Sequence, residues 1–427
     1  GAPRDLPSFP TRRSSDLGFE VTVLERGGPV AERKAAIDAF EAGGPFPADN
    51  NYAFGEGGAG TFSDGKLSSR TKGISLEREY LYDDFIAAGA PAEIRYMTHP
   101  HVGSDRLFGM TARLRSTLEE AGGRVVFGAR VDGLRVRGGK LIALESAKGA
   151  VEADAFVLAC GHSSFDTQRM LMRSGVPFKA KNFALGFRAE HEQDTVNRAQ
   201  WGVARLSGVK AAEYRLTAQA GDTGVYSFCM CPGGTVVQAS AFADASVVNG
   251  RSDYARDGRW ANAAIVAGLS LEALLGRELP AEEALDWLEA LERRYREAAG
   301  GWRAPAMTVR DFLAGRSGSA LPESSYAHGL MPTDLAELLP GALVPPLRDG
   351  LAQFCRKLRG YEDGTLLGLE SKTSAAVQAL RDPVALTSGY GNLYLAGEGS
   401  GWSGGIVSSA ADGLKAAQAI AAAFCRA

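Results

Sequence analysis

The sequence has little net charge and no long hydrophobic run. Its 427 residues carry a formal charge of −3, which gives no reason to expect a nucleic acid or an anionic membrane as a partner. No apolar run approaches the roughly 18 residues that suggest a membrane span. Hydrophobic residues make up 45% and charged residues 23%, an ordinary globular composition. At this length we expect two domains or one large discontinuous domain.

Cysteine is scarce and scattered. The five cysteines lie at positions 160, 229, 231, 355 and 425, a pattern that suits a reducing cytoplasm better than a disulfide scaffold. Cys229 and Cys231 form C-x-C rather than C-x-x-C, and no second Cys/His pair stands at zinc spacing, so no metal is expected. We expect a disulfide between them to be strained. A packing role is favoured over redox or acid–base chemistry.

No nucleotide-binding fingerprint opens the chain. Residues 8–17 match the in-frame translation of a common sequencing-adapter oligonucleotide, so residues 1–17 are interpreted as not native. Residues 18–27 alternate in polarity and predict a strand that reaches Glu25, the position of the ribose-binding acid in a dinucleotide-binding βαβ unit. The first strand of that unit and its glycine turn are then expected upstream of Gly18. A surface hairpin strand is the alternative.

A glycine-rich segment follows at residues 50–67. Five glycines lie within residues 55–67, among Thr, Ser, Asp and Lys side chains. Such a loop offers backbone N–H groups, hydroxyls and one ammonium group to a phosphate or a polyhydroxyl chain. It is not a P-loop, because Lys66 is followed by Leu67 and not by a hydroxyl residue. Phe54 and Phe62 favour a packed loop over a flexible one.

The remaining pattern predicts an α/β fold in two parts. A helix is expected over 105–122, a β-meander over short strands at 124–128, 133–136, 141–146 and 151–153, and a buried parallel-sheet strand over 155–163. Residues 166–384 are expected to form an inserted α+β cap or substrate domain with a helix at Ala281–Ala299. Residues 18–165 and 385–427 would form one discontinuous Rossmann-like domain.

A second glycine turn lies near the end of the chain. Gly399, Gly401 and Gly404 satisfy G-x-G-x-x-G, but only 23 residues follow, so the turn cannot open a βαβ unit. It closes a domain instead. We interpret it as a helix N-terminus built from glycines and facing an electron-rich group.

These motifs together resemble a known family. Residues 51–67, Gly161-His162-Ser163, residues 188–191, residues 225–234 with Cys-x-Cys-Pro-Gly-Gly, and Gly397-Glu398-Gly399 are similar to flavoproteins of the glutathione-reductase type with two dinucleotide-binding domains. The closer resemblance is to bacterial FAD-dependent dehydrogenases that carry a dedicated C-terminal cap domain. The family's first fingerprint is absent from this chain. The resemblance implies a Rossmann-like FAD-binding domain with a parallel sheet in three layers, and FAD between that domain and the cap.

The resemblance also implies the residues that bind FAD. Glu25 would bind the adenosine ribose with Arg26 beside it, and Val131 would contact adenine through its backbone. The segment that would wrap the pyrophosphate, the ribityl chain and one flavin edge comprises Gly57, Gly58, Ala59, Gly60, Thr61, Phe62, Ser63 and Lys66. Those expected near the flavin or the ribityl chain are Gly161, His162, Glu398, Gly404, Gly405 and Ile406. The last three would place N–H groups at the flavin N1/C2=O edge, where negative charge develops on reduction.

Catalytic candidates are His162, His191 and Cys229, although a lone histidine is more often part of the hydrogen-bonded scaffold. Four other charged side chains could bind an anionic substrate or simply form ion pairs on the surface. They are Arg188, Glu190, Lys372 and Arg381. The expected function is an FAD-dependent oxidoreductase of a small molecule, with NAD(P)H as a conceivable transient donor. The alternatives are an RNA-modifying flavoprotein and a truncated product with impaired FAD binding.

Overall fold

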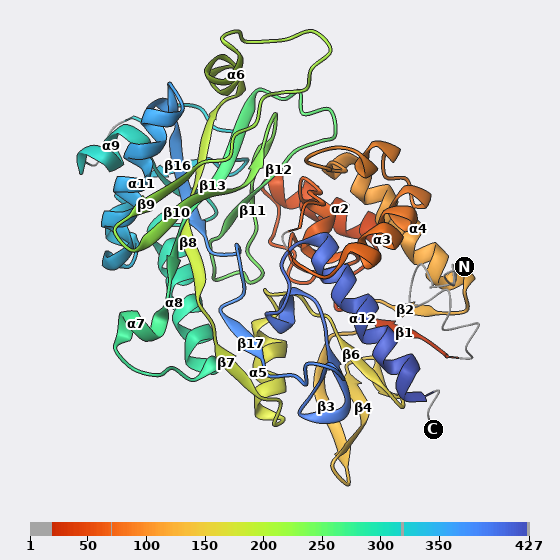
Figure 1. The fold of residues 1–427 in the computed structure, drawn as a ribbon. Helices are drawn as coiled ribbons and strands as arrows, with labels where there is room; N and C mark the ends of the chain where they lie inside the picture. Colours follow the sequence, from red (N-terminus) through yellow and green to blue (C-terminus); the bar gives the residue numbers. More distant parts are fainter. Residues whose placement is uncertain (1–18, 70, 317–319, 425–427) are drawn as a thin grey trace. The chain divides into compact units, whose positions relative to one another are not determined.

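The computed structural model describes residues 19–69, 71–316 and 320–424 (Figure 1). The interpretation of residues 1–17 lies outside this part. The contacts divide the chain into unit 1 (Gly1–Ile37, Asp49–Lys179 and Val377–Ala427) and unit 2 (Asp38–Ala48 and Ala180–Ala376). These limits fall near the expected 165 and 385, except that residues 38–48 join unit 2. The expected α/β class is confirmed, since both units combine helices and strands.

Unit 1 contains two separate pairs of parallel strands. β1 (Thr22–Leu24) pairs with β2 (Arg124–Val126), and β6 (Phe156–Leu158) pairs with β19 (Tyr390–Leu395), which also pairs with β18 (Thr387–Ser388). The expectation of a fully buried strand over 155–163 is wrong, because the strand is short and Val157 is 45% exposed. The strand is exposed because, within the described residues, β6 forms backbone hydrogen bonds with a neighbouring strand along only one of its edges.

The predicted meander is present in unit 1. It comprises β3 (Val131–Arg137), β4 (Lys140–Ser146) and β5 (Gly149–Glu152), whereas the strand that precedes it, β2, pairs with β1 instead. β7 (Phe178–Ala180) and β17 (Val377–Ala379) form a further pair where the chain passes from one unit to the other.

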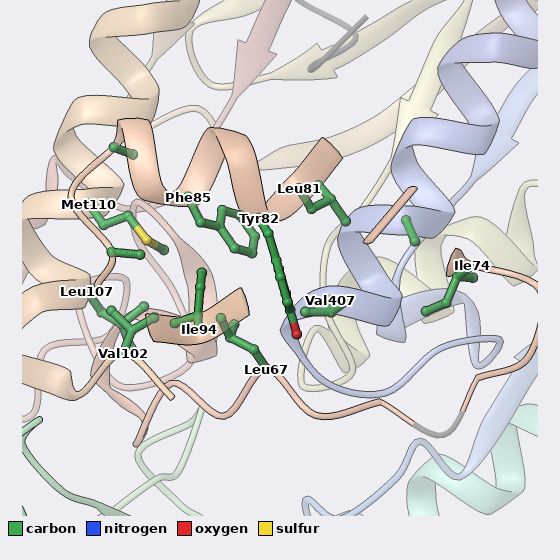
Figure 2. Packing of buried hydrophobic residues seen from close by; sticks show 13 residues of the cluster. Leu67, Ile74, Leu81, Tyr82, Phe85, Ile94, Val102, Leu107, Met110 and Val407 are labelled. Carbon is green, nitrogen blue, oxygen red and sulfur yellow. The ribbon is translucent and has the colours of Figure 1, made fainter. Parts of the chain in front are cut away.

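Three helices and a loop build one core of unit 1 (Figure 2). α3 (Ser75–Ala87), α4 (Ser104–Glu120) and α12 (Ile406–Phe424) contribute buried side chains around Leu67 and Ile94. The helix predicted over 105–122 is confirmed, and Leu107, Met110 and Leu118 of its stripe are buried. The other helical elements that begin in unit 1 are α2 (Val30–Glu41), α5 (Phe165–Arg173), η1 (Gly58–Phe62), η2 (Ala92–Arg95) and η5 (Glu398–Ser400).

Unit 2 is built on a seven-stranded sheet of order β15-β14-β16-β8-β13-β10-β9. The strands are β8 (Phe183–Glu192), β9 (Thr217–Ala220), β10 (Thr223–Cys231), β13 (Trp260–Leu269), β14 (Ala304–Thr308), β15 (Leu330–Pro332) and β16 (Thr365–Glu370). Neighbours are antiparallel except β14 and β15. A hairpin-like pair, β11 (Thr235–Gln238) and β12 (Val248–Arg251), contacts β8, β13 and β16 through β12.

Helices cover the sheet of unit 2. They are α6 (Gln193–Trp201), α7 (Leu271–Leu275), α8 (Ala281–Ala299), α9 (Val309–Ala314), α10 (Leu335–Leu338) and α11 (Val344–Lys357), with η3 (Gly341–Leu343) and η4 (Tyr361–Asp363). The helix predicted at Ala281–Ala299 is confirmed and ends at Gly300 with φ +59°. α11 contacts β9, β10 and β13, and a Cβ added to Gly350 would lie 2.5 Å from Cγ1 of Val225. Of the helices in the described residues, none has the length and apolar character needed to cross a membrane.

Candidate FAD site

Glu25 lies just beyond β1 and is fixed by backbone donors. Its Oε1 accepts hydrogen bonds from the N–H groups of Gly27 at 2.9 Å and Gly55 at 3.0 Å. Because both hydrogen bonds go to Oε1, the carboxylate is oriented and Oε2 can accept from another donor. This is the arrangement that a ribose hydroxyl requires, and the sequence-based role of Glu25 stays a prediction.

Arg26 is committed to protein partners. Its guanidinium forms two hydrogen bonds with Asp166, at 3.1 and 2.8 Å, and one with Asp49 at 3.2 Å. It also lies 3.9 Å from the ring centre of Phe54. Arg26 therefore ties the end of β1 to α5 and to the segment before the glycine loop. Because its charge is already paired with Asp166 and Asp49, its effect on a ligand would come from holding these segments in place.

The segment that leads to Val131 starts beside Glu25. The N–H of Ala129 donates to the carbonyl oxygen of Glu25 at 2.8 Å, and that of Gly128 donates to Gly27 at 3.0 Å. Val131 then begins β3. The structure thus brings the predicted ribose and adenine contacts to one end of the β1–β2 pair.

Arg33 organises the glycine-rich loop, and sequence reasoning missed it. Its side chain is fully buried and donates to the carbonyl oxygens of Asn51, Glu56 and Gly58, each at 2.8 Å. Burial lowers the pKa of Arg33 to about 10, although the negative charges of Glu25 and Glu56 oppose this change. Its Nη2 is buried without a hydrogen-bond partner in the described structure. The loop is therefore wrapped around one helical side chain.

Glu56 is a second residue that the sequence did not single out. Its Oε2 accepts from the N–H of Val30 at 2.6 Å, at the start of α2, and its Oε1 accepts from Arg115 at 2.7 Å. The hydrogen bond with Glu56 raises the pKa of Arg115. A carboxylate at a helix N-terminus is stabilised by the helix dipole, so this end of α2 is already capped by the protein.

The other side chains of the loop also serve the loop itself. Ser63 Oγ donates to the carbonyl of Gly60 at 2.7 Å, and Lys66 donates to the buried Asp64 at 2.5 Å. Thr61 and Phe62 are buried, and the hydroxyl oxygens of Thr61 and Thr111 lie 3.4 Å apart. The groups that this loop could offer a ligand are therefore mainly the backbone atoms of residues 57–60. Gly57 and Gly58 have φ values of +81° and +60°, a region that favours glycine.

Three segments far apart in sequence meet in unit 1. A Cβ added to Gly60 would lie 3.4 Å from the side chain of Ile406, and one added to Gly399 would lie 2.6 Å from the carbonyl oxygen of Gly161. Gln168 of α5 joins them, since its Nε2 donates to the carbonyl of Gly399 at 3.2 Å. The glycine loop, the turn after β6 and the turn before α12 are therefore adjacent, as the resemblance implies.

The N-terminus of α12 is held rigidly. The N–H of Ser409 donates to the carbonyl of Gly405 at 3.0 Å, so the N–H groups of residues 406–408 are the donors that a helix leaves without a backbone partner. The N–H of Gly404, also predicted to face the flavin, donates to Ser408 Oγ at 3.3 Å. Asp412 accepts two hydrogen bonds from Arg381, at 2.9 and 2.7 Å, and one from the N–H of Gly397 at 2.9 Å. This ion pair fixes the first turns of α12 to the glycine turn.

Open space lies over the glycines of these turns. A Cβ added to Gly58, Gly161 or Gly405 would meet no heavy atom within 4 Å. Glu398 is half-buried, and its Oε1 would lie 3.6 Å from a Cβ at Gly404. The carboxylates of Glu25 and Glu398, the bare backbone and the helix N-terminus suit hydroxyl groups and an electron-rich ring, so the residues present fit FAD.

The three catalytic candidates lie in different units. His162 is half-buried in the turn after β6, with its Nδ1 3.2 Å from Ser163 Oγ, whereas His191 and Cys229 belong to unit 2. His191 is buried, its Nε2 lies 2.8 Å from the carbonyl of Tyr361, and burial lowers its pKa. Catalytic roles for all three stay predictions.

The four side chains considered for anion binding all have protein partners. Arg188 pairs with Glu370 at 3.0 Å, Lys372 with Glu292 at 2.7 Å, and Arg381 with Asp412 at 2.7 Å. Glu190 accepts hydrogen bonds from Ser325, and burial raises its pKa. Three of the four therefore form ion pairs and Glu190 is held by hydrogen bonds, while a role in binding an anionic substrate stays a prediction.

Known proteins share both sequence and fold features with this chain. Residues 182–373 match the family model described as FAD-dependent protein, C-terminal domain-like. A Clostridium beijerinckii protein, described as uncharacterized, is 40% identical over 411 residues, which are 94% of this chain and 76% of that protein. The expectation of FAD as cofactor is confirmed by the family match.

Solved structures resemble the chain only distantly. Tetracycline destructase Tet(55) has a TM-score of 0.41 at 10% identity, covering 98% of this chain and 78% of that one. A salicylate hydroxylase substrate complex has a TM-score of 0.38 at 12% identity, covering 94% and 78%. CtdE in complex with FAD has a TM-score of 0.34 at 11% identity, covering 94% and 83%. Likeness at these scores carries no argument about substrate or mechanism.

Proposed function

This chain belongs to the same family as the Clostridium beijerinckii protein and carries the FAD-dependent C-terminal domain, and we propose that it is a dehydrogenase of a small molecule. In this proposal FAD accepts a hydride from an oxidisable substrate or from NAD(P)H acting as a transient donor. An RNA-modifying flavoprotein is the alternative, and a gel-shift assay with tRNA distinguishes the two.

One observation supports the proposal above the others. The glycine loop, the turn after β6 and the N-terminus of α12 meet within unit 1 and leave open space over Gly58, Gly161 and Gly405. Glu25 and Glu398 would accept hydrogen bonds from hydroxyl groups of the cofactor. The first N–H groups of α12 would stabilise negative charge on the ring, because a helix N-terminus carries a partial positive charge. FAD, when bound, supplies the hydride acceptor that no amino-acid side chain can supply.

The strand edges of unit 1 support a second part of the proposal. β1 and β6 contribute Leu24, Phe156 and Leu158 to one hydrophobic cluster, yet within the described residues the two strands belong to separate sheets. Val23 is 40% exposed and Val157 is 45% exposed. We propose that one more parallel strand pairs with both edges. Backbone N–H groups of β1 and β6 that all exchange as freely as those of an open strand edge would contradict this second part.

The test of the main proposal uses Glu398. Apo-protein is titrated with FAD by flavin fluorescence, with Glu398→Gln as the variant and the exposed Glu20→Gln as the matched control. A hydrogen bond to a charged group contributes about 1.5–3 kcal/mol, so Kd should rise by about 10- to 100-fold in Glu398→Gln. The control should bind as the parent does. Equal affinities in all three proteins would refute the role of Glu398.

The reaction class needs a separate measurement. The FAD-loaded protein is mixed anaerobically with NADH, with NADPH and with a panel of oxidisable metabolites, and the loss of flavin absorbance is followed. Bleaching by one of the metabolites supports a dehydrogenase. Loaded flavin that no donor reduces would contradict the proposed function.

A further inference from the structure

The C-x-C segment of β10 has an irregular backbone. Phe228 pairs with Ala264 and Cys231 with Asn262, so β10 contains one more residue than β13 between these pairs. Cys229 sits in this bulge with φ +46°, a value that non-glycine residues rarely adopt. β10 is therefore one strand with a bulge at Cys229. Strained backbone of this kind is concentrated at functional sites.

A buried guanidinium contacts the backbone of Cys229 and the thiol of Cys231. Nη2 of Arg188 donates to the carbonyl of Cys229 at 2.8 Å and to Sγ of Cys231 at 3.4 Å. Arg188 is fully buried, and its Nη1 pairs with Glu370 at 3.0 Å. Burial opposes the charge, yet the acidic groups of Cys231, Glu370 and Cys229 together hold the pKa of Arg188 above its usual value.

This environment favours reactive thiol chemistry. A neighbouring cation stabilises a thiolate, and the thiolate is the form that reacts with oxidants. Cys229 is half-buried, so an oxidant can reach it, whereas Cys231 is fully buried directly behind the bulge. The thiol of Cys231 lies beside the backbone of Cys229, since its Sγ is 3.4 Å from the carbonyl oxygen of Cys229.

We propose that Cys229 and Cys231 form a reversible thiol-oxidation site. The Cys229 thiolate attacks a hydroperoxide, ROOH; one proton is taken up, and Cys229–SOH and ROH are formed. The thiol of Cys231 then attacks the sulfur of Cys229–SOH, releases water and closes the disulfide. A dithiol reductant restores both thiols and becomes a cyclic disulfide itself. The roles are distinct: Cys229 is oxidised first, and Cys231 resolves.

Two other cysteines provide internal controls. Burial raises the pKa of Cys355 to about 11, and burial likewise raises that of Cys160 to about 11. At about pH 7.5 such a thiol is roughly 0.03% thiolate. We therefore expect Cys229 to react with iodoacetamide at least about tenfold faster than Cys355, although both are half-buried.

The experiment uses the full chain in a Cys425→Ser background. Protein is treated with cumene hydroperoxide, the remaining thiols are blocked, and the tryptic peptide between Arg215 and Arg251 is analysed by mass spectrometry. The expected product has lost two hydrogens and is restored by dithiothreitol. In Cys231→Ser the same treatment should leave a sulfenic acid on Cys229 that dimedone captures. Cys355→Ser should behave as the parent.

The outcomes separate the proposal from a packing role. Equal alkylation rates at Cys229 and Cys355, or oxidation of Cys229 without a reversible disulfide in the parent, would overturn it. Thermal unfolding of each variant shows whether Cys231→Ser is folded, and the parent's oxidation product tests the proposal even if that variant is not. None of these readouts depends on flavin reduction, so a failure of the proposed dehydrogenase function would be seen separately.

Discussion

Replacement of Arg33 by methionine should loosen the glycine-rich loop. The substitution keeps most of the side-chain volume and removes the donors to the carbonyls of Asn51, Glu56 and Gly58. A buried polar group that loses its partner costs about 1–3 kcal/mol, but the three carbonyls share one guanidinium and the loop can adjust. Desolvation of the charged side chain, seen in its lowered pKa, offsets part of the loss. We expect a net destabilisation of about 2–4 kcal/mol.

The effect should be measured within the loop itself, because a chain of two units need not unfold in one step. Hydrogen exchange of peptides that cover residues 51–62 should accelerate in Arg33→Met, and the affinity for FAD should fall more than about tenfold. Lys34→Met is the matched control, since it removes the same charge from the next, exposed position of α2. If both variants exchange and bind FAD as the parent does, Arg33 does not hold the loop.

Two further substitutions test the packing and the pH response. Gly399→Ala should destabilise unit 1 by about 1–3 kcal/mol, because its Cβ would lie 2.6 Å from the carbonyl oxygen of Gly161. Gly413→Ala, whose Cβ would meet open space on α12, should instead stabilise by about 0.5–1 kcal/mol. Equal Tm values for the two variants would contradict this reasoning. Burial lowers the pKa of His191, so the stability linked to its neutral form is full above about pH 6.5 and is lost as the pH falls below it. His191→Gln should therefore lose less Tm than the parent between about pH 7.5 and about pH 5.5, while the exposed His99→Gln should match the parent.

Periodic features of the sequence predicted the regular elements well. α4 and α8 follow apolar stripes that end at glycines, and both helices lie within a few residues of their expected limits. The meander was predicted because its turns carry Gly138-Gly139 and Lys148-Gly149 between short apolar strands. These are local patterns, and local backbone preferences are enough to produce them.

The interior of the site could not be predicted in the same way. Arg33 stands at helical spacing with the buried residues Val30, Ile37 and Phe40, so the period marks its face of α2 as buried, but a charged residue at that position does not reveal its partners. Its role depends on a loop that begins well downstream. Glu56 is similar, since it caps α2 from within the glycine loop. Such contacts follow from tertiary structure and leave no periodic signal in the sequence.

The exposure of β6 shows the opposite error. Its apolar composition indicated burial on both faces, but burial depends on which neighbours are present and not on composition alone. The bulge at Cys229 was missed for a related reason: an extra residue in one strand is defined by the partner strand, and β13 lies outside the local window.

The dependence of the glycine loop on Arg33 has a consequence for folding order. A chain segment with several glycines loses much conformational entropy when it is fixed, and here the compensating hydrogen bonds come from a residue of α2. The loop can therefore take its final shape only after α2 has docked and its guanidinium is in place. The backbone surface proposed to hold the cofactor is thus complete only when α2 is docked, so any change that loosens α2 should also weaken cofactor binding.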